Sequence, residues 1–235
     1  MNSFDLEFIN LLNQFSNLSQ NFDLTVRFIS SNYLVKSGIL LSLIWWAWFN
    51  ESSDRSSARI HCVSTLVGCV IAIAIGRALA LLLPFRLRPI HNENLDFLVT
   101  YGMNPDLLDG WSSFPSDHAV LFYSISAGLY YISKKLGLFA FFYTTVFIAL
   151  PRVYLGLHFP TDIVAGALIG FAIAVFCNAV FFQEKVCRPV IRFSAYKPEF
   201  FYPLFFLVTY QIADMFNSSR EVLRFLYAGF KAIFG

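Results

Sequence analysis

Charged residues are scarce in this sequence. Asp, Glu, Lys and Arg make up 14% of the 235 residues, whereas a soluble domain usually carries about 25%. The net charge is only +2, and no cluster of basic residues is dense enough to bind a nucleic-acid backbone. These deficits exclude an ordinary soluble domain and argue against a nucleic-acid partner.

The sequence also shows neither a metal-binding cysteine pattern nor the pattern of a signal peptide in its first 30 residues. The four cysteines show no metal-ligand spacing, and most of them lie in apolar runs, where cysteine behaves as a small hydrophobic residue. We therefore infer no disulfide. The first 30 residues contain Asp5, Glu7 and Asp23 and lack a basic start followed by an apolar core. We expect no cleavable signal peptide.

Apolar residues dominate instead. They make up 57% of the chain, aromatics reach 18%, and the mean hydropathy is +0.60. This composition predicts an all-α, polytopic membrane bundle. We treat the chain as one membrane-embedded domain, 1–235, with the bundle over 34–217. The predicted spans cover about 34–50, 60–84, 116–133, 136–152, 161–182 and 199–217.

The segments that flank the predicted bundle are amphipathic. Residues 4–18 repeat Phe and Leu at helical spacing between polar residues, and 218–235 read as a second amphipathic helix. Segments of this kind lie in the membrane interface, so 1–33 and 218–235 are predicted interfacial helices. Packing of the first helix against the bundle is an equal alternative. Lys36, at the start of the first span, would have to snorkel to the interface.

Three polar segments stand at the ends of long apolar runs. They are Arg86-Leu-Arg88-Pro89, Trp111 to His118, and Pro151 to Asp162. The second span ends at the first segment and the third span begins at the second, so both lie on one membrane side. The third and fourth spans cross and return, which brings the last segment to the same side. The sequence therefore predicts one shared site within 85–162.

The residue types at this site are suited to a phosphate. Arg88 and Arg152 offer planar, bidentate donors. Pro115 and Pro160 are typical of first helical turns. Helix N-termini have free N–H groups that favour anions, so Ser116 in the first turn is a further candidate phosphate ligand.

Two histidines could supply the chemistry. His158 and Asp162 are four residues apart at a helix start, where the carboxylate can fix the ring tautomer and leave the other nitrogen as a nucleophile. His118 can protonate a leaving oxygen. The same residues could instead bind a metal, but the arginines oppose a cation in that pocket. We expect no metal and no other cofactor.

The segments resemble the type-2 phosphatidic acid phosphatase family, whose superfamily includes the vanadium haloperoxidases. The matching residues are Arg88-Pro89, Pro115-Ser116-Asp117-His118, and Arg152, His158 and Asp162 at the family spacing. The resemblance implies a metal-independent reaction in which His158 forms a phosphohistidine, Asp162 orients it, and His118 protonates the leaving group. It also implies that Arg88, Arg152 and Ser116 hold the phosphate.

Two positions depart from the family pattern. The family lysine falls at Leu81, and the family serine before Arg152 is Pro151. Arg86, in the loop, is our preferred replacement for the lost lysine contact. Arg77, one turn before Leu81, is the alternative, although helical side chains lean toward the N-terminus and away from the site.

Taken together, these residues predict a phosphatase that acts on a lipid phosphate or diphosphate in the bilayer. Polyprenyl carriers and phosphatidic-acid-type lipids fit equally well, with a preference for the former in a small, bacterial-type chain. A phosphotransferase and an inactive lipid-binding homologue are the alternatives. The face opposite the motifs has eight basic residues, against five on the motif face once Arg88 and Arg152 are set aside. We therefore expect a bacterial inner-membrane protein with a non-cytoplasmic site.

Overall fold

The computed structural model describes residues 2–50 and 55–234. These residues form helices and connecting loops without any β-strand, so the predicted all-α class is confirmed. In chain order the helical segments are α1 (Ser3–Asn13), α2 (Gln20–Ser31), η1 (Leu34–Gly38), α3 (Ile39–Phe49), α4 (Arg55–Leu82), η2 (Pro89–His91), α5 (Asp117–Ile132), α6 (Lys134–Tyr143), η3 (Thr144–Ala149), α7 (Leu150–Tyr154), α8 (Pro160–Cys177), α9 (Val180–Phe182), η4 (Gln183–Cys187), α10 (Arg188–Tyr196), α11 (Pro198–Ala213) and α12 (Asn217–Phe234).

Fewer helices qualify as membrane spans than the sequence predicted. Within the described residues, Ser56–Leu82, Lys134–Tyr154 and Pro160–Cys177 are long and apolar enough, and a fourth candidate is α2 with Leu34–Phe49, bent by 60°. Helices α5 and α11 have 16 residues each. At 1.5 Å per residue each extends about 24 Å, short of a bilayer core of roughly 30 Å. Three or four spans are therefore supported, rather than six.

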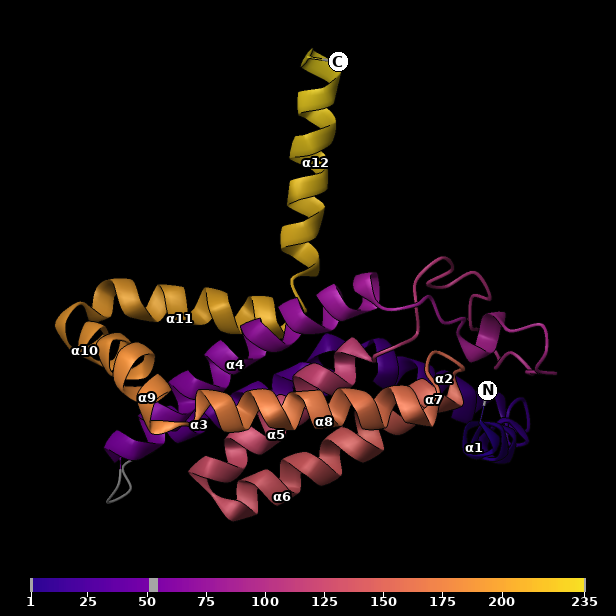
Figure 1. Ribbon diagram of the computed structural model, residues 1–235, viewed down its shortest axis with the longest axis horizontal. Coiled ribbons are helices and arrows are strands. Elements are labelled where there is room, and N and C mark those ends of the chain that lie inside the picture. Colours follow the sequence, from indigo (N-terminus) through magenta and orange to yellow (C-terminus); the bar gives the residue numbers. More distant parts are fainter. Residues whose placement is uncertain (1, 51–54, 235) are drawn as a thin grey trace.

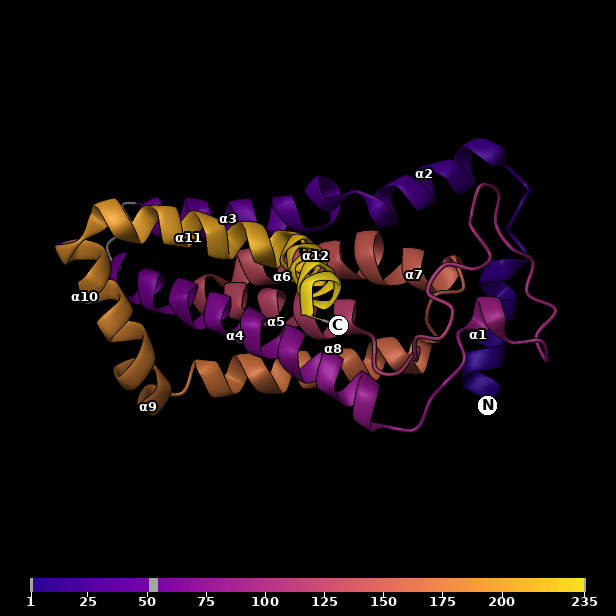
Figure 2. The same cartoon turned by 90° about the horizontal axis from the view of Figure 1, so that it is seen from above.

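Helix α5 lies at the centre of the bundle. It packs against α4, α6 and α8 (Figures 1 and 2). At one end of the long axis, α9, η4 and α10 connect α8 to α11 (Figure 2). At the other end lie α1, α2, α7 and the long loop between α4 and α5. The bundle therefore has a compact helical end and a loop-rich end.

Two glycines let α8 approach the first half of α5. A Cβ atom at Gly170 would lie 2.4 Å from the carbonyl oxygen of Val120, and one at Gly166 would lie 2.7 Å from that of Ser116. Small residues that allow such approach are typical of helix contacts in membranes. The contact fixes the start of α5 against α8 near the loop-rich end.

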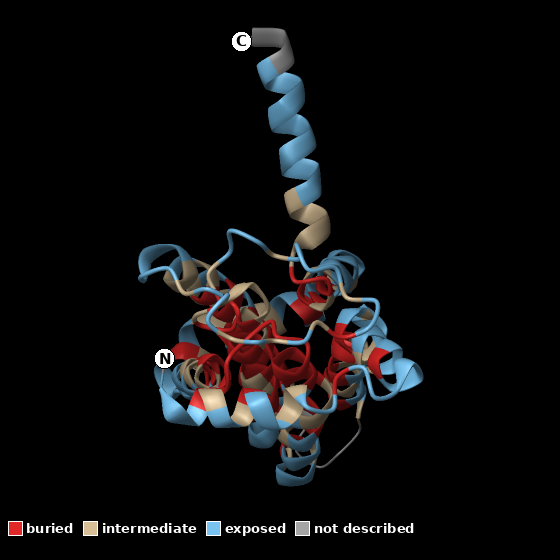
Figure 3. Ribbon diagram, turned by 90° about the vertical axis from the view of Figure 1, so that its right-hand side faces the viewer, coloured by how far each residue is buried: buried red, intermediate tan, exposed pale blue. Residues whose placement is uncertain are grey.

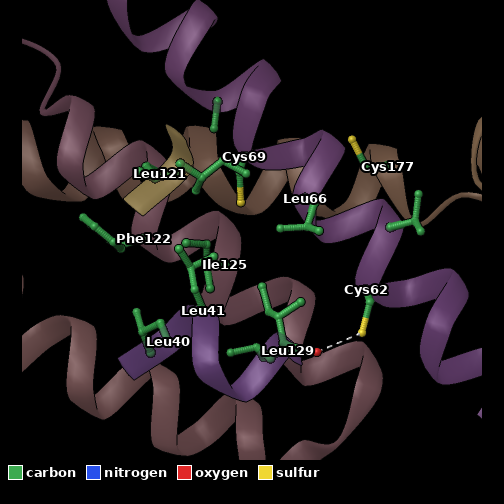
Figure 4. Packing of buried hydrophobic residues seen from close by; sticks show 14 of the residues in the cluster. Leu40, Leu41, Cys62, Leu66, Cys69, Leu121, Phe122, Ile125, Leu129 and Cys177 are labelled. Carbon is green, nitrogen blue, oxygen red and sulfur yellow. Dashed lines mark hydrogen bonds between the residues drawn. The ribbon is translucent and has the colours of Figure 1, made fainter. Parts of the chain in front are cut away.

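The main apolar core is built by α3, α4 and α5 together with residues of α6, α8 and α11. Figure 4 shows Leu40 and Leu41 near Phe122, Ile125 and other residues of α5 and α4. The Sγ atom of Cys62 donates to the carbonyl oxygen of Ile44 at 3.7 Å. All four cysteines are free and buried, as expected of small hydrophobic side chains in an apolar interior.

The two ends of the chain differ in their packing. Helix α1 contacts α7 and α8, and α2 contacts α7, η1 and η3, so both N-terminal helices pack against the bundle. Helix α12 instead projects from the end of α11, across the direction of the bundle helices (Figure 1). Figure 3 shows it exposed along most of its length, with the buried residues gathered in the bundle.

Candidate active site

A cavity of about 580 Å³ opens at the loop-rich end of the bundle. All three polar segments of the sequence contribute to its wall: the first through Arg88, the second through Trp111 and His118, and the third through Arg152 and His158. Helices α2, α4 and α12 add further residues. Arg88 and His158, which are 70 positions apart in the sequence, therefore line the same cavity.

His158 follows a tight turn after α7. Gly156 has a φ of +69°, and a Cβ atom there would lie 2.5 Å from the Phe97 ring, so the turn requires glycine. The side chain is 3% exposed. Its Nδ1 lies 2.8 Å from the carbonyl oxygen of Ser113. Since a carbonyl only accepts, Nδ1 carries the proton and Nε2 has a free lone pair.

Asp162 stabilises this histidine by charge rather than by a hydrogen bond. Its Oδ2 lies 3.7 Å from Nδ1 of His158 and accepts instead from the Phe159 backbone N–H at 2.7 Å. The Ser113 carbonyl therefore fixes the tautomer, a role that the sequence assigned to Asp162. Burial lowers the pKa of His158, Asp162 opposes this, and Arg88 adds to it. The net result favours the neutral ring.

His118 belongs to a second polar chain of contacts. Its Nδ1 lies 2.8 Å from Oδ1 of Asp117, and Oδ2 of Asp117 forms an ion pair with Arg77 at 2.8 Å. The Nε2 atom of His118 lies 2.5 Å from Nη2 of Arg152. Asp117 therefore orients His118.

Arg88 and Arg152 are both buried in the cavity wall, at 6% and 7% exposure. Arg88 donates to the carbonyl oxygens of Trp111, Ser112 and Leu157 at 2.5 to 3.2 Å, and its Nη1 lies 3.4 Å from Nε2 of His158. Burial lowers the pKa of Arg88. These carbonyls hold the guanidinium beside the histidine.

Two arginines that line the cavity each have a buried Nε atom without a hydrogen-bond partner among the described residues. These arginines are Arg77 and Arg152. A buried donor without a partner costs about 1–3 kcal/mol. Arg77 also lies over the Trp111 ring, 5.6 Å from its centroid.

Two predicted phosphate ligands do not reach the cavity. Arg86 donates to Oδ1 of Asp162 at 2.5 Å, to Oδ2 of Asp5 at 2.7 Å and to Thr161 at 2.9 Å. It joins α1 to α8 instead of facing a ligand. Ser116 is fully buried, and its hydroxyl caps α5 by accepting from the Ala119 N–H at 3.4 Å.

The helix starts also differ in detail from the sequence prediction. Pro160 is the first residue of α8, as its sequence context suggested, but Pro115 precedes the N-cap Ser116 and lies outside α5. The first turn of α5 therefore begins at Asp117. The Ser116 N–H donates to the carbonyl oxygen of Asp162 at 3.2 Å, which holds the two helix starts together.

Several cavity residues were missed at the sequence level. Lys36 was assigned to the interface, yet it is 4% exposed and its Nζ lies 3.4 Å from Nε2 of His118. Arg220 and Arg224 of α12 also line the cavity. A lysine inside an apolar run is a functional candidate by default, and that signal could have identified Lys36.

Metal-binding side chains do not converge in this cavity. Across residues 2–50 and 55–234, no three His, Cys, Asp or Glu side chains come together as a group that could hold a metal ion. The cavity wall has seven Lys and Arg side chains and two carboxylates, Asp117 and Glu221. Its charge favours an anion.

Comparison with known proteins agrees with this geometry. Residues 58–185 match the family model described as PAP2 superfamily. The match covers more than half of the chain and includes Arg88, both histidines, Arg152 and Asp162. The chain belongs to the PAP2 superfamily, the group that its motifs resembled.

Among three relatives of the chain, two are phosphatases by name. The bacitracin transport permease protein BcrC of Bacillus licheniformis is 29% identical over 133 residues, which are 55% of this chain and 58% of the relative. The lipid A 4'-phosphatase of Bacteroides thetaiotaomicron is 38% identical over 86 residues, 36% of this chain and 38% of the relative. The undecaprenyl-diphosphatase BcrC of Bacillus subtilis is 26% identical over 167 residues, 70% of this chain and 76% of the relative. The first two matches span less than two thirds of the relatives' lengths.

Proposed function

We propose that the protein is an integral-membrane phosphatase that removes phosphate from a lipid phosphate or diphosphate through a phosphohistidine. The observation that carries this proposal is the pair of histidines at one cationic cavity. Each has its Nδ1 tied to an acceptor, Ser113 or Asp117, so each directs Nε2 to the reacting group. One nitrogen can attack phosphorus while the other handles the proton.

In the first step, the Nε2 lone pair of His158 attacks phosphorus, and the bond from phosphorus to the leaving oxygen breaks. His118 enters this step as the imidazolium, with Nδ1–H held by Asp117; it gives its Nε2 proton to that oxygen and becomes neutral. The Ser113 carbonyl and the Asp162 carboxylate stabilise the positive charge on the phosphorylated ring, at 2.8 and 3.7 Å from Nδ1. Arg88 and Arg152 hold the phosphate oxygens.

In the second step, His118 accepts a proton from water, and the resulting hydroxide attacks phosphorus. The N–P bond breaks and its electron pair returns to His158. The neutral tautomer that burial favours is restored, and inorganic phosphate leaves. No step in this scheme requires a metal, and the cationic wall of the cavity opposes one.

The substrate combines a phosphate group with a lipid tail. The cavity lies at the loop-rich end of an apolar bundle. The phosphate headgroup of a lipid can therefore enter the cavity while the lipid tail lies along the exposed apolar helices. The names of the relatives include an undecaprenyl-diphosphatase and a lipid A 4'-phosphatase. These names support a polyprenyl phosphate or diphosphate or another anionic lipid as the substrate.

The whole chain acts as one domain in this proposal, with the six predicted crossings; the short helices α5 and α11 would cross where the bilayer thins around them. Helix α12 lies across the bundle direction, and therefore along the membrane surface (Figure 1). Its exposed apolar residues, among them Phe225, Leu226 and Phe230, suit an interfacial helix. The charge asymmetry of the connecting segments supports a bacterial inner membrane with the cavity on the non-cytoplasmic face.

The test is phosphate release by the purified protein from polyprenyl diphosphate, polyprenyl phosphate and phosphatidic acid, with and without chelator. We expect release that survives the chelator and is lost in His158→Ala but not in His91→Ala, a control in the neighbouring loop. Transfer of labelled phosphate to an added alcohol without free phosphate would indicate a phosphotransferase. Binding of lipid without either product would indicate an inactive homologue.

The intermediate can be tested separately. Brief incubation with a substrate labelled at phosphorus should leave an acid-labile label on the protein, at His158. Full phosphate release by His158→Ala would refute this mechanism.

A further inference from the structure

The family lysine is absent at its expected position, and no residue nearby takes its place. Leu81 stands there, and its side chain is 78% exposed on the outside of α4. Arg86 is occupied by Asp5 and Asp162, and Arg77 by Asp117. The cation that would complete a phosphate site must come from another part of the fold.

Lys36 brings an ammonium group to the required place. It lies in η1, a π-helical turn between α2 and α3, and such turns are frequent at functional sites. Its side chain is 4% exposed and lines the same cavity as Arg88 and Arg152. Its Nζ lies 3.4 Å from Nε2 of His118.

No carboxylate of the described residues forms an ion pair with this ammonium group. In the described residues, no carboxylate lies within 4.0 Å of Nζ, and the recorded neighbours are His118 and the Tyr33 ring, 4.5 Å from Nζ to the centroid. A buried charge without a partner is costly. The ammonium group has three N–H donors. One of them can point to Nε2 of His118, which Arg152 also contacts, so at least two remain for a ligand.

We propose that Lys36 binds a phosphate oxygen of the substrate and replaces, from a different helix, the lysine that the motif has lost. This proposal rests on the proposed phosphatase function. A phosphate between Lys36 and Arg152 would be the missing counterion for both, and it would lie beside the Nε2 atom of His118 that gives up the proton.

The Tyr33 ring helps to position this lysine. The Tyr33 hydroxyl accepts a hydrogen bond from Nδ2 of Asn217, the first residue of α12, at 2.7 Å. Tyr33 therefore joins α12 to Lys36, and its ring limits the directions that the ammonium group can take.

The test compares Lys36→Met, Lys36→Arg and Lys231→Met, where Lys231 is an exposed lysine on α12. We expect Lys36→Met to lower kcat/KM by about 10²–10³, as for loss of one transition-state donor. Lys36→Arg should retain a larger share of the activity because it keeps the charge. Lys231→Met should match the wild type. Wild-type kcat/KM in Lys36→Met would overturn the proposal.

A binding measurement separates a ligand contact from a structural role. Orthovanadate resembles phosphate in transfer and should raise the Tm of the wild type by mass action. In Lys36→Met the Tm without vanadate should be unchanged or higher, because an unpaired buried charge is removed, while the vanadate-induced rise is lost. A lower Tm without vanadate, with the vanadate-induced rise intact, would overturn the proposal.

Chemical rescue gives a third measurement. Alkylation of Lys36→Cys with 2-bromoethylamine restores an ammonium group at nearly the length of lysine, and we expect it to restore activity. The native thiols are buried, and wild type treated in parallel controls for their reaction. If the wild type releases no phosphate from any lipid, the phosphatase proposal fails, and the vanadate measurement still tests Lys36 by itself.

Discussion

Replacing Arg86 by leucine should destabilise the fold rather than remove a phosphate contact. Arg86 forms ion pairs at 2.7 Å with Asp5 and at 2.5 Å with Asp162, and both carboxylates are fully buried. Removal of one partner of a buried ion pair typically costs about 3–5 kcal/mol. The Arg86 side chain is 27% exposed, so we expect the lower end of that range.

Both carboxylates keep other donors in this variant, which limits the loss. Asp5 still accepts from the backbone and hydroxyl of Thr161, at 3.0 and 2.7 Å. Asp162 still accepts from the Phe159 N–H. The double variant Arg86→Leu/Asp5→Asn should regain about 1–2 kcal/mol, because one of the two uncompensated charges is removed with the arginine.

The assay is denaturant unfolding in detergent together with kcat/KM of the folded protein. Arg192→Leu, an exposed arginine at the far end of the bundle, is the matched control and should leave both quantities unchanged. We expect Arg86→Leu to lower the free energy of unfolding by about 3 kcal/mol and to change kcat/KM less than Arg77→Leu does. Wild-type stability with a loss of phosphate binding would refute this reasoning and restore Arg86 as a ligand.

Three further predictions concern the helix contact and the two histidines. Gly170→Ala should lower the free energy of unfolding by about 1–3 kcal/mol through overpacking against α5. Gly68→Ala is the control, because its added Cβ would lie 3.6 Å from the nearest atoms; it should be neutral or stabilising by up to about 1 kcal/mol. If denaturant unfolding shows that both variants lose the same free energy of unfolding, the close approach of α8 to α5 is not the cause. Asp117→Asn should lower kcat by about 10²–10⁴ with little change in KM, because His118 loses the acceptor that fixes its tautomer; steady-state kinetics with an unchanged kcat would exclude this role. Burial lowers the pKa of His158, and the neutral ring is the nucleophile, so activity should persist as pH falls and be lost only below the ordinary histidine value of about 6.5. A pH profile of kcat/KM whose acid limb lies at or above that value would contradict the assignment.

The order and spacing of the motifs were sufficient to predict where the site is. Crossing parity predicts that Arg88, His118 and His158 lie at the same membrane face, because each helix reverses the direction of the chain. This argument depends on the number of crossings and does not depend on the residues at which each helix begins or ends. The structure brings the three residues to one cavity.

The roles of individual polar side chains were harder to predict. Asp162 and Ser113 compete for the same nitrogen of His158, and the backbone carbonyl is the closer of the two. Spacing of four residues indicated that Asp162 was near the ring. It could not indicate a carbonyl 45 residues away, because that contact depends on how the loop before α5 folds over the turn before α8.

The sequence by itself determined the helical class, the apolar character of the chain, and the set of histidines and arginines at one end of the bundle. These follow from local composition and from the alternation of helix direction. The tertiary structure decided which cations face the cavity: Arg86 turns to Asp5 and Asp162, while Lys36 comes in from another helix. The physical reason is that side-chain direction depends on the rotation and packing of each helix, and long-range packing sets both.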